Sequence, residues 1–400
     1  MNLLDSKTGR SILASALYFT EGAPIGFIWW ALPTLMRKRG IQIDLITLLT
    51  AILVFPWVFK FLWAPLIDTL RTKKRGYKFW IFITQTFMAL SLFPLIFIQP
   101  ENNIFLWGLL LFLHSIFAAT QDVSIDALII NVVVRDERGK INGFMNAGML
   151  IGRSIFGGGT LIIASSLGLN YAIILLIVTI FSTMFLLLFI KEPCVQKETE
   201  NKFKIFIENI VLSFSDKNTW LAIIFALTAA ASFESAGALA GPFLTDLNIN
   251  SESIGIFFAL PVVVAMLIGG IIGGYLSDRT SRKKAVTIFL IGFVFCVLLI
   301  SVYNLIGGTD SFIYLSSFTT MYFFVGLFTA SSYALFMDLT NPIIGGTQFS
   351  TYMAATNGCE AWAVWLAGMT TASSGYSKAF ILMSIISLLS LVVLRMIKLK

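Results

Sequence analysis

The sequence predicts an all-α membrane protein whose twelve transmembrane helices form two similar halves of six helices each. The first observation is the composition: 57% of the 400 residues are hydrophobic and 12% are charged, whereas soluble domains carry about 25% charged residues. The second is a series of long apolar segments, and the third is a repeat of charged positions between the two halves. A soluble globular domain of this composition would lack the polar side chains to cover its surface, so we exclude that class.

The apolar segments are long enough to cross a bilayer, which requires roughly 20 residues as a helix. Backbone polar groups must be satisfied inside lipid, so we expect each segment to be helical. The first segment is too long for a signal peptide, and we expect it to be retained. The predicted spans are 12–36, 44–68, 79–99, 104–128, 143–168, 170–190, 220–245, 253–277, 286–306, 312–338, 348–373 and 377–397.

Lys and Arg in the loops set the expected orientation. With the N-terminus inside, most of them fall on inside segments, such as 71–78 and 279–284, as the positive-inside rule requires. We therefore expect both termini in the cytoplasm, and we interpret the net charge of +7 as topology charges rather than as a nucleic-acid surface. The outer cluster Arg37–Arg39 breaks the rule. It indicates either an entry vestibule for an anionic solute or contact with lipid phosphates.

Four pairs of ionisable residues recur at nearly the same separation in the two halves. The polar stretch 191–219, which contains a short amphipathic segment, lies between the halves, so we expect an N-terminal bundle (1–190), a cytoplasmic linker (191–219) and a C-terminal bundle (220–400). Duplicated halves around a central cavity are typical of transporters. The pairs are Glu21 with Glu234, Asp68 with Asp278, Asp126 with Asp338, and Arg153 with Glu360.

The stretch "GGYLSDRTSRKK" resembles the conserved cytoplasmic loop motif of the major facilitator superfamily, through Gly274, Asp278, Arg279, Arg282 and Lys283. The first-half copy is degenerate and keeps Asp68. The stretches "YFTEGAPIGF", "FKFLWAPLID", "ATQDVSIDAL", "ERGKINGF" and "FMDLTNPIIGGTQFSTYMAATN" resemble the AmpG muropeptide permeases, which are grouped with acetyl-CoA transporters and some siderophore importers.

This resemblance implies two rocking six-helix bundles in the bacterial inner membrane. It also implies proton-driven import of anhydro-muropeptides for peptidoglycan recycling. The small residues within 152–160 and 269–275 lie on spans 5 and 8, which the family fold places together at the seam between the halves. Small residues permit such a close approach of helices.

Glu21 and Glu234 are the candidate proton-coupling residues. Glu21 lies about ten residues into its span, near ~15 Å depth, and Glu234 is similarly deep in span 7. A carboxyl in a low-dielectric environment favours its protonated form, so such a group can take up a proton on one side and release it on the other. The alternative is a protonated carboxyl that only hydrogen-bonds two helices together.

Arg153, Glu360, Trp29 and Trp30 are the candidate substrate-binding residues. Arg153 stays charged and therefore needs an acidic partner or an anionic ligand. Glu360 occupies the corresponding place in the second half. An aromatic wall made by Trp29 and Trp30 would stack on sugar rings, although Trp is more often a packing or interfacial residue.

The remaining charges are the candidate cytoplasmic gate. Asp122 and Asp126 lie four residues apart, on one face of a helix. Asp122 lies about 27 Å from the start of span 4 and Asp126 another turn lower, so both are expected near the cytoplasmic mouth. We expect Lys60 to pair with Asp122 or Glu360, the alternative being that it snorkels to the interface, and the basic loop after Asp68 to approach the two aspartates. The alternative is a solvated helix end. The predicted gate residues are Lys60, Asp68, Asp122, Asp126, Asp278, Arg279 and Asp338.

Neither a cofactor nor a metal is expected, because the chain has one histidine, and its three cysteines lack paired spacing. A magnesium-diphosphate site like that of membrane prenyltransferases would need a second acidic pair, but Pro342 stands four residues after Asp338. We therefore expect no enzyme, no ATP-binding loop and no nucleic-acid partner, but a monomer that interacts with a small solute, protons and lipid. The alternatives are an importer of a siderophore or another anionic metabolite, and a muropeptide-sensing signal protein without transport.

Overall fold

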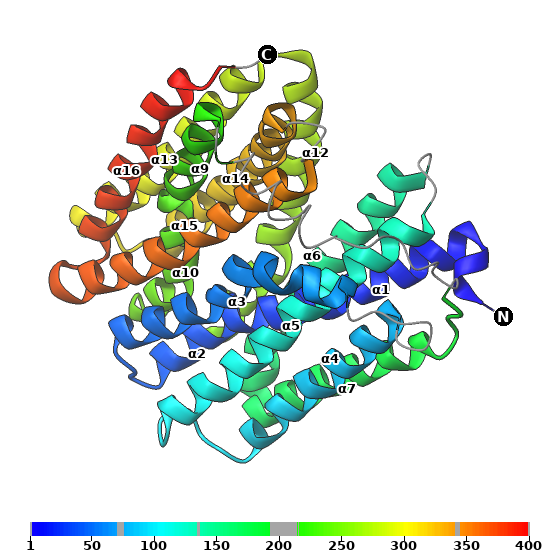
Figure 1. Cartoon of the computed structure of the whole chain (residues 1–400). Helices are drawn as coiled ribbons and strands as arrows, with labels where there is room; N and C mark the ends of the chain where they lie inside the picture. Colours follow the sequence, from blue (N-terminus) through cyan, green and yellow to red (C-terminus); the bar gives the residue numbers. More distant parts are fainter. Residues whose placement is uncertain are drawn as a thin grey trace. The chain divides into compact units, whose positions relative to one another are not determined.

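The computed structural model describes residues 2–69, 76–133, 137–192, 214, 216–340 and 345–398, and these residues are almost entirely helical (Figure 1). Within these ranges, eleven helical stretches are long and apolar enough to cross a membrane. The helix at the remaining predicted span, α15, has 30 residues and is not among those eleven. All twelve predicted spans coincide with helices, whose ends differ by a few residues from those expected.

Several spans consist of more than one helical element. The first joins α1, a short π-helical turn (η2) and α2, and the eighth joins α11, a second π-helical turn (η5) and α12. The first-half elements are η1 (Leu3–Asp5), α1 (Lys7–Gly26), η2 (Phe27–Ala31), α2 (Leu32–Lys38), α3 (Ile43–Thr69), α4 (Tyr77–Leu92), η3 (Phe93–Ile96), α5 (Ile104–Val132), α6 (Arg138–Ser166) and α7 (Leu169–Leu187). The second-half elements are α9 (Lys217–Ala229), α10 (Ala231–Asp246), α11 (Ser251–Phe257), η5 (Phe258–Val262), α12 (Val263–Arg279), α13 (Arg282–Leu305), α14 (Ser311–Leu339), α15 (Gly345–Ser374) and α16 (Tyr376–Met396).

Local sequence explains where helices begin. The Asn103 side chain accepts a hydrogen bond from the Leu106 backbone N–H at 3.0 Å, at the start of α5. Asp310 caps α14 in the same way, and such caps satisfy the otherwise unpaired donors of a first turn. Gly168 and Gly375 precede α7 and α16 with φ values of 106° and 87°, a conformation that favours glycine.

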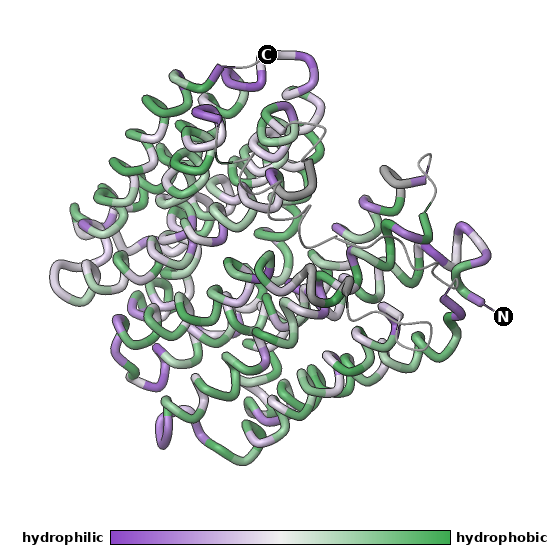
Figure 2. The backbone as a smooth tube through the Cα atoms, viewed as in Figure 1, coloured by the Kyte–Doolittle hydropathy of each residue, from purple (hydrophilic) through white to green (hydrophobic). Residues whose placement is uncertain are grey.

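The outer faces of the helices are apolar. Figure 2 shows hydrophobic residues along the helices and hydrophilic residues gathered towards many helix ends. Large side chains such as Ile271, Phe295 and Leu389 are more than half exposed. Apolar surface on this scale is not tolerated in water, and it fits the lipid-facing surface of a multi-pass membrane protein.

The chain divides into two compact units. Unit 1 comprises Met1–Met36, Phe59–Glu200 and Ser251–Ala259, and unit 2 comprises Arg37–Val58, Asn201–Asn250 and Leu260–Lys400. Each unit thus combines most of one half of the sequence with a short segment of the other half. Most of the linker predicted at 191–219, including its amphipathic segment, lies outside the described residues, so that domain division stays a prediction.

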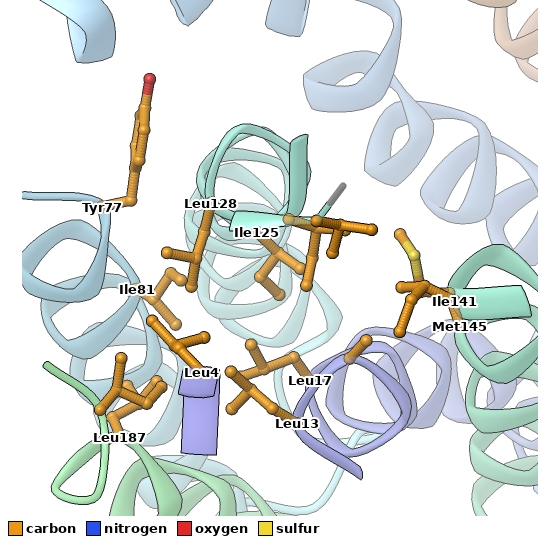
Figure 3. Packing of buried hydrophobic residues seen from close by; sticks show 14 of the residues in the cluster. Leu4, Leu13, Leu17, Tyr77, Ile81, Ile125, Leu128, Ile141, Met145 and Leu187 are labelled. Carbon is orange, nitrogen blue, oxygen red and sulfur yellow. The ribbon is translucent and has the colours of Figure 1, made fainter. Parts of the chain in front are cut away.

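The core of unit 1 lies where α1, α4, α5 and α6 meet. Leu13 and Leu17 of α1 pack with Ile125 and Leu128 of α5, and all four side chains are 0% exposed. Figure 3 shows this cluster together with Leu4, Tyr77, Ile81, Ile141, Met145 and Leu187. These contacts hold α1 against α5. The candidate site described below lies on the same two helices.

Glycines let α1 and α6 approach closely. A Cβ atom added to Gly148 of α6 would collide with the Ser15 carbonyl oxygen of α1, and one added to Gly152 would collide with that of Phe19. Gly158 of α6 meets span 8 and lies against Gly255 of α11 and Ala259 of η5, within unit 1. Spans 5 and 8 therefore meet at α6 and the α11–η5 segment within unit 1, and the expected seam between the halves stays a prediction.

Replacing Gly148 with Ala is expected to destabilise unit 1 by about 2 kcal/mol, because a side chain there must push two backbones apart. Gly143→Ala is the matched control on the same helix, since nothing lies within 4 Å of an added Cβ there. The thermal midpoint of the detergent-purified protein measures the difference. Equal midpoints for the two variants would show that the α1–α6 contact is not close-packed.

Ion pairs also connect α1 to Glu137, the residue that precedes α6. The Arg10 guanidinium donates to Glu137 Oε2 from Nε at 3.1 Å and from Nη2 at 2.7 Å, and Lys7 lies 3.4 Å from the same carboxylate. The Arg10 hydrogen bonds, helped by Lys7, hold the pKa of Glu137 below its usual value of 4.5.

This lowered pKa predicts a specific acid sensitivity. The ionised Glu137 contributes stability above its unfolded-state pKa, and that contribution is lost as the pH falls through the lower folded-state pKa. Wild type should therefore be more stable than Glu137→Gln at neutral pH, and the two should converge on acidification. Thermal midpoints measured from pH 7 downward test this, and a constant difference across the range would contradict it.

Candidate functional site

The candidate site is built on two facing helices of unit 1. Tyr18 and Glu21 lie three residues apart on α1, and Asp122 and Asp126 lie four apart on α5, so each pair occupies one face of its helix. Glu21 is 5% exposed and Asp122 is 3% exposed. Buried carboxyl groups are costly in an apolar bundle unless donors or cations satisfy them.

Two of these carboxyl groups have a direct partner. Lys60 of α3 forms an ion pair with Asp122, and the Tyr18 hydroxyl donates a hydrogen bond to Asp126. The predicted pairing of Lys60 with Asp122 is therefore present. The direct partner of Asp126 is a neutral donor, whereas the Lys60 ammonium pairs directly with Asp122.

Glu21 lies among all these charges. Asp122, Asp126, Lys60 and Arg153 each act on its carboxyl group electrostatically, and Arg153 comes from the neighbouring helix α6. Among the described residues, Glu21 Oε2 and Arg153 Nε are buried without a hydrogen-bond partner. We call Tyr18, Glu21, Lys60, Asp122, Asp126 and Arg153 the unit 1 charge cluster.

The charge balance of this cluster is uneven. It contains three carboxyl groups and two cationic side chains, because the arginine remains protonated in proteins. With every group ionised, the cluster carries one net negative charge inside an apolar bundle. A single bound proton would make it neutral, and Glu21 is a carboxyl whose Oε2 has no hydrogen-bond donor among the described residues.

The structure therefore brings together residues that the sequence assigned to separate places. Glu21 was predicted as a proton carrier, Arg153 as a substrate contact, and Lys60 and Asp122 as part of a gate, yet they form one cluster. Sequence reasoning missed Tyr18. Its position one helical turn before Glu21, in "YFTEGAP", was the available signal.

Unit 2 holds the other two predicted carboxyl groups. Glu234 of α10 and Glu360 of α15 are half-buried, and both act electrostatically on the buried thiol of Cys359. They therefore lie near the same point of unit 2. Arg153, the counterpart of Glu360 in the repeat, belongs to unit 1.

The two candidate tryptophans differ in their surroundings. Trp30 is 7% exposed and stacks on Phe258, with ring centroids 5.4 Å apart. A side chain at Gly157 would also collide with its ring, so Trp30 is used in the packing of unit 1. Trp29 is half-buried and stays a candidate for substrate contact.

The loop motif of the second half forms an ion network. Arg282 Nη1 lies 2.6 Å from Asp278 Oδ1, and Arg282 Nε lies 3.0 Å from Asp338 Oδ2. Arg279 instead covers the ring of Tyr275, 4.1 Å from its centroid. The network joins the end of α12 to the start of α13 and the end of α14. The side chain of Asp68 and the basic loop 71–75 lie outside the described residues.

Arg37 is neutralised within unit 2. It donates to both Asp246 oxygens, from Nε at 2.7 Å and from Nη2 at 2.9 Å, and Tyr376 donates to Asp246 Oδ2 at 2.7 Å. The first arginine of the Arg37–Arg39 cluster, for which the sequence left an anion vestibule and lipid phosphates open, thus binds Asp246 of α10 within unit 2.

A groove of about 430 Å³ runs along α1 on unit 1 and lies apart from these charges. Its lining includes Ile12, Ser15 and Phe19 of α1 and Phe144 of α6. None of the charge-cluster residues lines it, so we do not assign it to the candidate site.

The chain is similar in sequence to known bacterial transport proteins. The chain is 24% identical to the anhydromuropeptide permease of Escherichia coli over 393 residues, which cover 93% of this chain and 76% of that protein. It is 23% identical over 382 residues to a Rickettsia bellii protein that carries the name AmpG 1, with 91% and 92% of the two chains covered.

Solved structures share the fold at low identity. The nucleoside transporter NupG matches with a TM-score of 0.76 at 13% identity and covers 100% of both chains. A D-xylose-proton symporter matches with a TM-score of 0.76 at 12% identity and covers 97% of both chains. These matches show the fold alone.

The family model of the major facilitator superfamily matches residues 14–236 and 221–399, which together span nearly the whole chain. The helical order, the apolar outer faces and the buried charges agree with that match. The chain is a multi-pass membrane transporter that belongs to the major facilitator superfamily.

Proposed function

We propose that this protein is a proton-driven importer of anhydro-muropeptides across the bacterial inner membrane, and that it serves peptidoglycan recycling. It would act as a monomer with both termini in the cytoplasm. The observation that carries the proton coupling is the unit 1 charge cluster. A group of buried charges that one proton makes neutral can change its charge during a transport cycle.

The substrate class is supported by similarity. The Escherichia coli relative is named an anhydromuropeptide permease, and the match covers most of both proteins. A muropeptide joins sugar rings to a short acidic peptide, so its carboxylates suit a cationic contact. Arg153 is the candidate for that contact, with Glu360 and Trp29 as further contacts and Glu234 as a second proton carrier.

The ion pairs at helix ends are the candidate gate. Arg282 with Asp278 and Asp338 would hold the ends of α12, α13 and α14 together in one state and release them in another. Arg279 would contribute through its stacking on Tyr275. Asp68 would take the equivalent place in the first half, and Lys60 with the α5 aspartates would couple this gate to the bound proton.

Uptake of labelled anhydro-muropeptide into proteoliposomes under an imposed pH gradient tests the proposal. We expect accumulation that an uncoupler abolishes. Uptake of a ferric chelate with no muropeptide flux would instead identify a siderophore importer. Muropeptide binding without any flux would identify a sensing protein, and either result would overturn the proposed function.

A further inference from the structure

The hydrogen bond between Tyr18 and Asp126 addresses which carboxyl group of the unit 1 charge cluster binds the proton. Three carboxyl groups compete for it: Glu21, Asp122 and Asp126. Asp122 has the Lys60 ammonium as its partner, which stabilises its ionised form. The outcome therefore depends on how Asp126 is stabilised relative to Glu21.

Among the residues that the structure describes, the following groups act on these carboxyls. Asp122 and Lys60 act on Asp126, together with the hydrogen bond from Tyr18. Asp122, Asp126, Lys60 and Arg153 act on Glu21. Asp126, Glu21 and Asp122 act on Tyr18, so the phenol faces all three carboxyls.

Tyr18 differs from the two cations in an important respect. Its hydroxyl stabilises a carboxylate by donating a hydrogen bond and adds no positive charge to the cluster. A lysine at this position would neutralise the cluster and remove its need for a proton. The phenol therefore satisfies Asp126 and leaves the excess negative charge to be neutralised elsewhere.

We propose that Tyr18 is a positioning residue, which holds Asp126 in its ionised form through their hydrogen bond and so directs the coupling proton to Glu21. This inference rests on the proposed proton coupling. The proton enters from the outer solution, binds a Glu21 carboxylate oxygen and leaves from the same atom to the cytoplasm. Tyr18 keeps its own proton throughout.

The test is the pH dependence of muropeptide uptake into proteoliposomes. Tyr18→Phe removes the hydroxyl and keeps the ring, so Asp126 becomes a competing proton acceptor. We expect the pH of half-maximal uptake to rise by about one unit, since hydrogen bonds to charged groups are strong enough for a shift of this size. Tyr171→Phe, on an exposed part of α7, is the matched control and should leave the profile unchanged.

Removing the other end of the hydrogen bond should have the opposite effect. Asp126→Asn leaves two carboxyl groups against two cations, so the cluster no longer needs a proton. The pH of half-maximal uptake should then fall. A purely structural contact would shift the thermal midpoint in both variants without moving the pH profile in opposite directions.

The possible outcomes distinguish the proposed proton coupling from the role of Tyr18. If wild-type uptake ignores the pH gradient, the proposed proton coupling fails. If wild-type uptake is driven by the pH gradient, proton coupling is supported. If Tyr18→Phe and Asp126→Asn then leave the pH profile of uptake unchanged, or shift it in the same direction, the proposed positioning role of Tyr18 is wrong.

Discussion

Glu21→Gln is expected to abolish solute accumulation while leaving exchange intact. Glutamine has the shape of a protonated glutamate but neither binds nor releases a proton, so the variant cluster stays neutral. With one proton per solute, wild type should accumulate substrate about tenfold per unit of pH gradient, and the variant should reach an accumulation ratio of about one. Uptake and counterflow exchange in the same proteoliposomes measure both properties.

Two control variants sharpen this result. Glu137→Gln changes a carboxyl group outside the charge cluster and should keep full accumulation. Glu234→Gln changes the repeat counterpart of Glu21 in unit 2. Lost accumulation in Glu234→Gln together with normal accumulation in Glu21→Gln would assign proton coupling to unit 2 instead.

Lys60→Met is expected to destabilise the protein and stop transport. The substitution leaves Asp122, which is 3% exposed, without its cationic partner. Removing one member of a buried ion pair costs about 3 kcal/mol, which should appear as a fall of several degrees in the thermal midpoint. The variant cluster would also need two protons rather than one to become neutral.

A second substitution distinguishes the loss of the pair from simple damage to packing. Lys60→Met combined with Asp122→Asn removes both charges, so the cluster again needs one proton to become neutral, and the double variant should recover most of the lost stability. If Lys60→Met alone is as stable as wild type, the ion pair is not a buried structural contact. If the double variant is less stable than Lys60→Met, packing at these positions matters more than charge.

The twelve spans were predictable because a bilayer places strict demands on sequence. A helix that crosses lipid must be long, apolar and internally hydrogen-bonded, so its residues identify it without knowledge of its neighbours. Asn103 and Asp310 mark helix starts through contacts within a few residues. By contrast, the segment 37–58 belongs to unit 2 and the segment 251–259 to unit 1. These assignments depend on contacts between residues distant in sequence.

The candidate site was predictable residue by residue but not as an assembly. The cost of burying charge identified Glu21, Lys60, Asp122, Asp126 and Arg153 as unusual, because each stands in an apolar segment. Depth estimates along separate helices placed Glu21 near mid-membrane and Asp122 near the cytoplasmic mouth, because such estimates take no account of how the helices pack. Tyr18 escaped notice because tyrosine is common in membrane helices and carries no charge.

The central claim is that one proton binds the unit 1 charge cluster at Glu21, and infrared absorption of protonated carboxyl groups in the purified protein tests it most directly. As the pH is lowered, wild type should show a protonated-carboxyl band that is missing in Glu21→Gln and retained in Glu234→Gln and Glu360→Gln. A band that persists unchanged in Glu21→Gln would contradict the account.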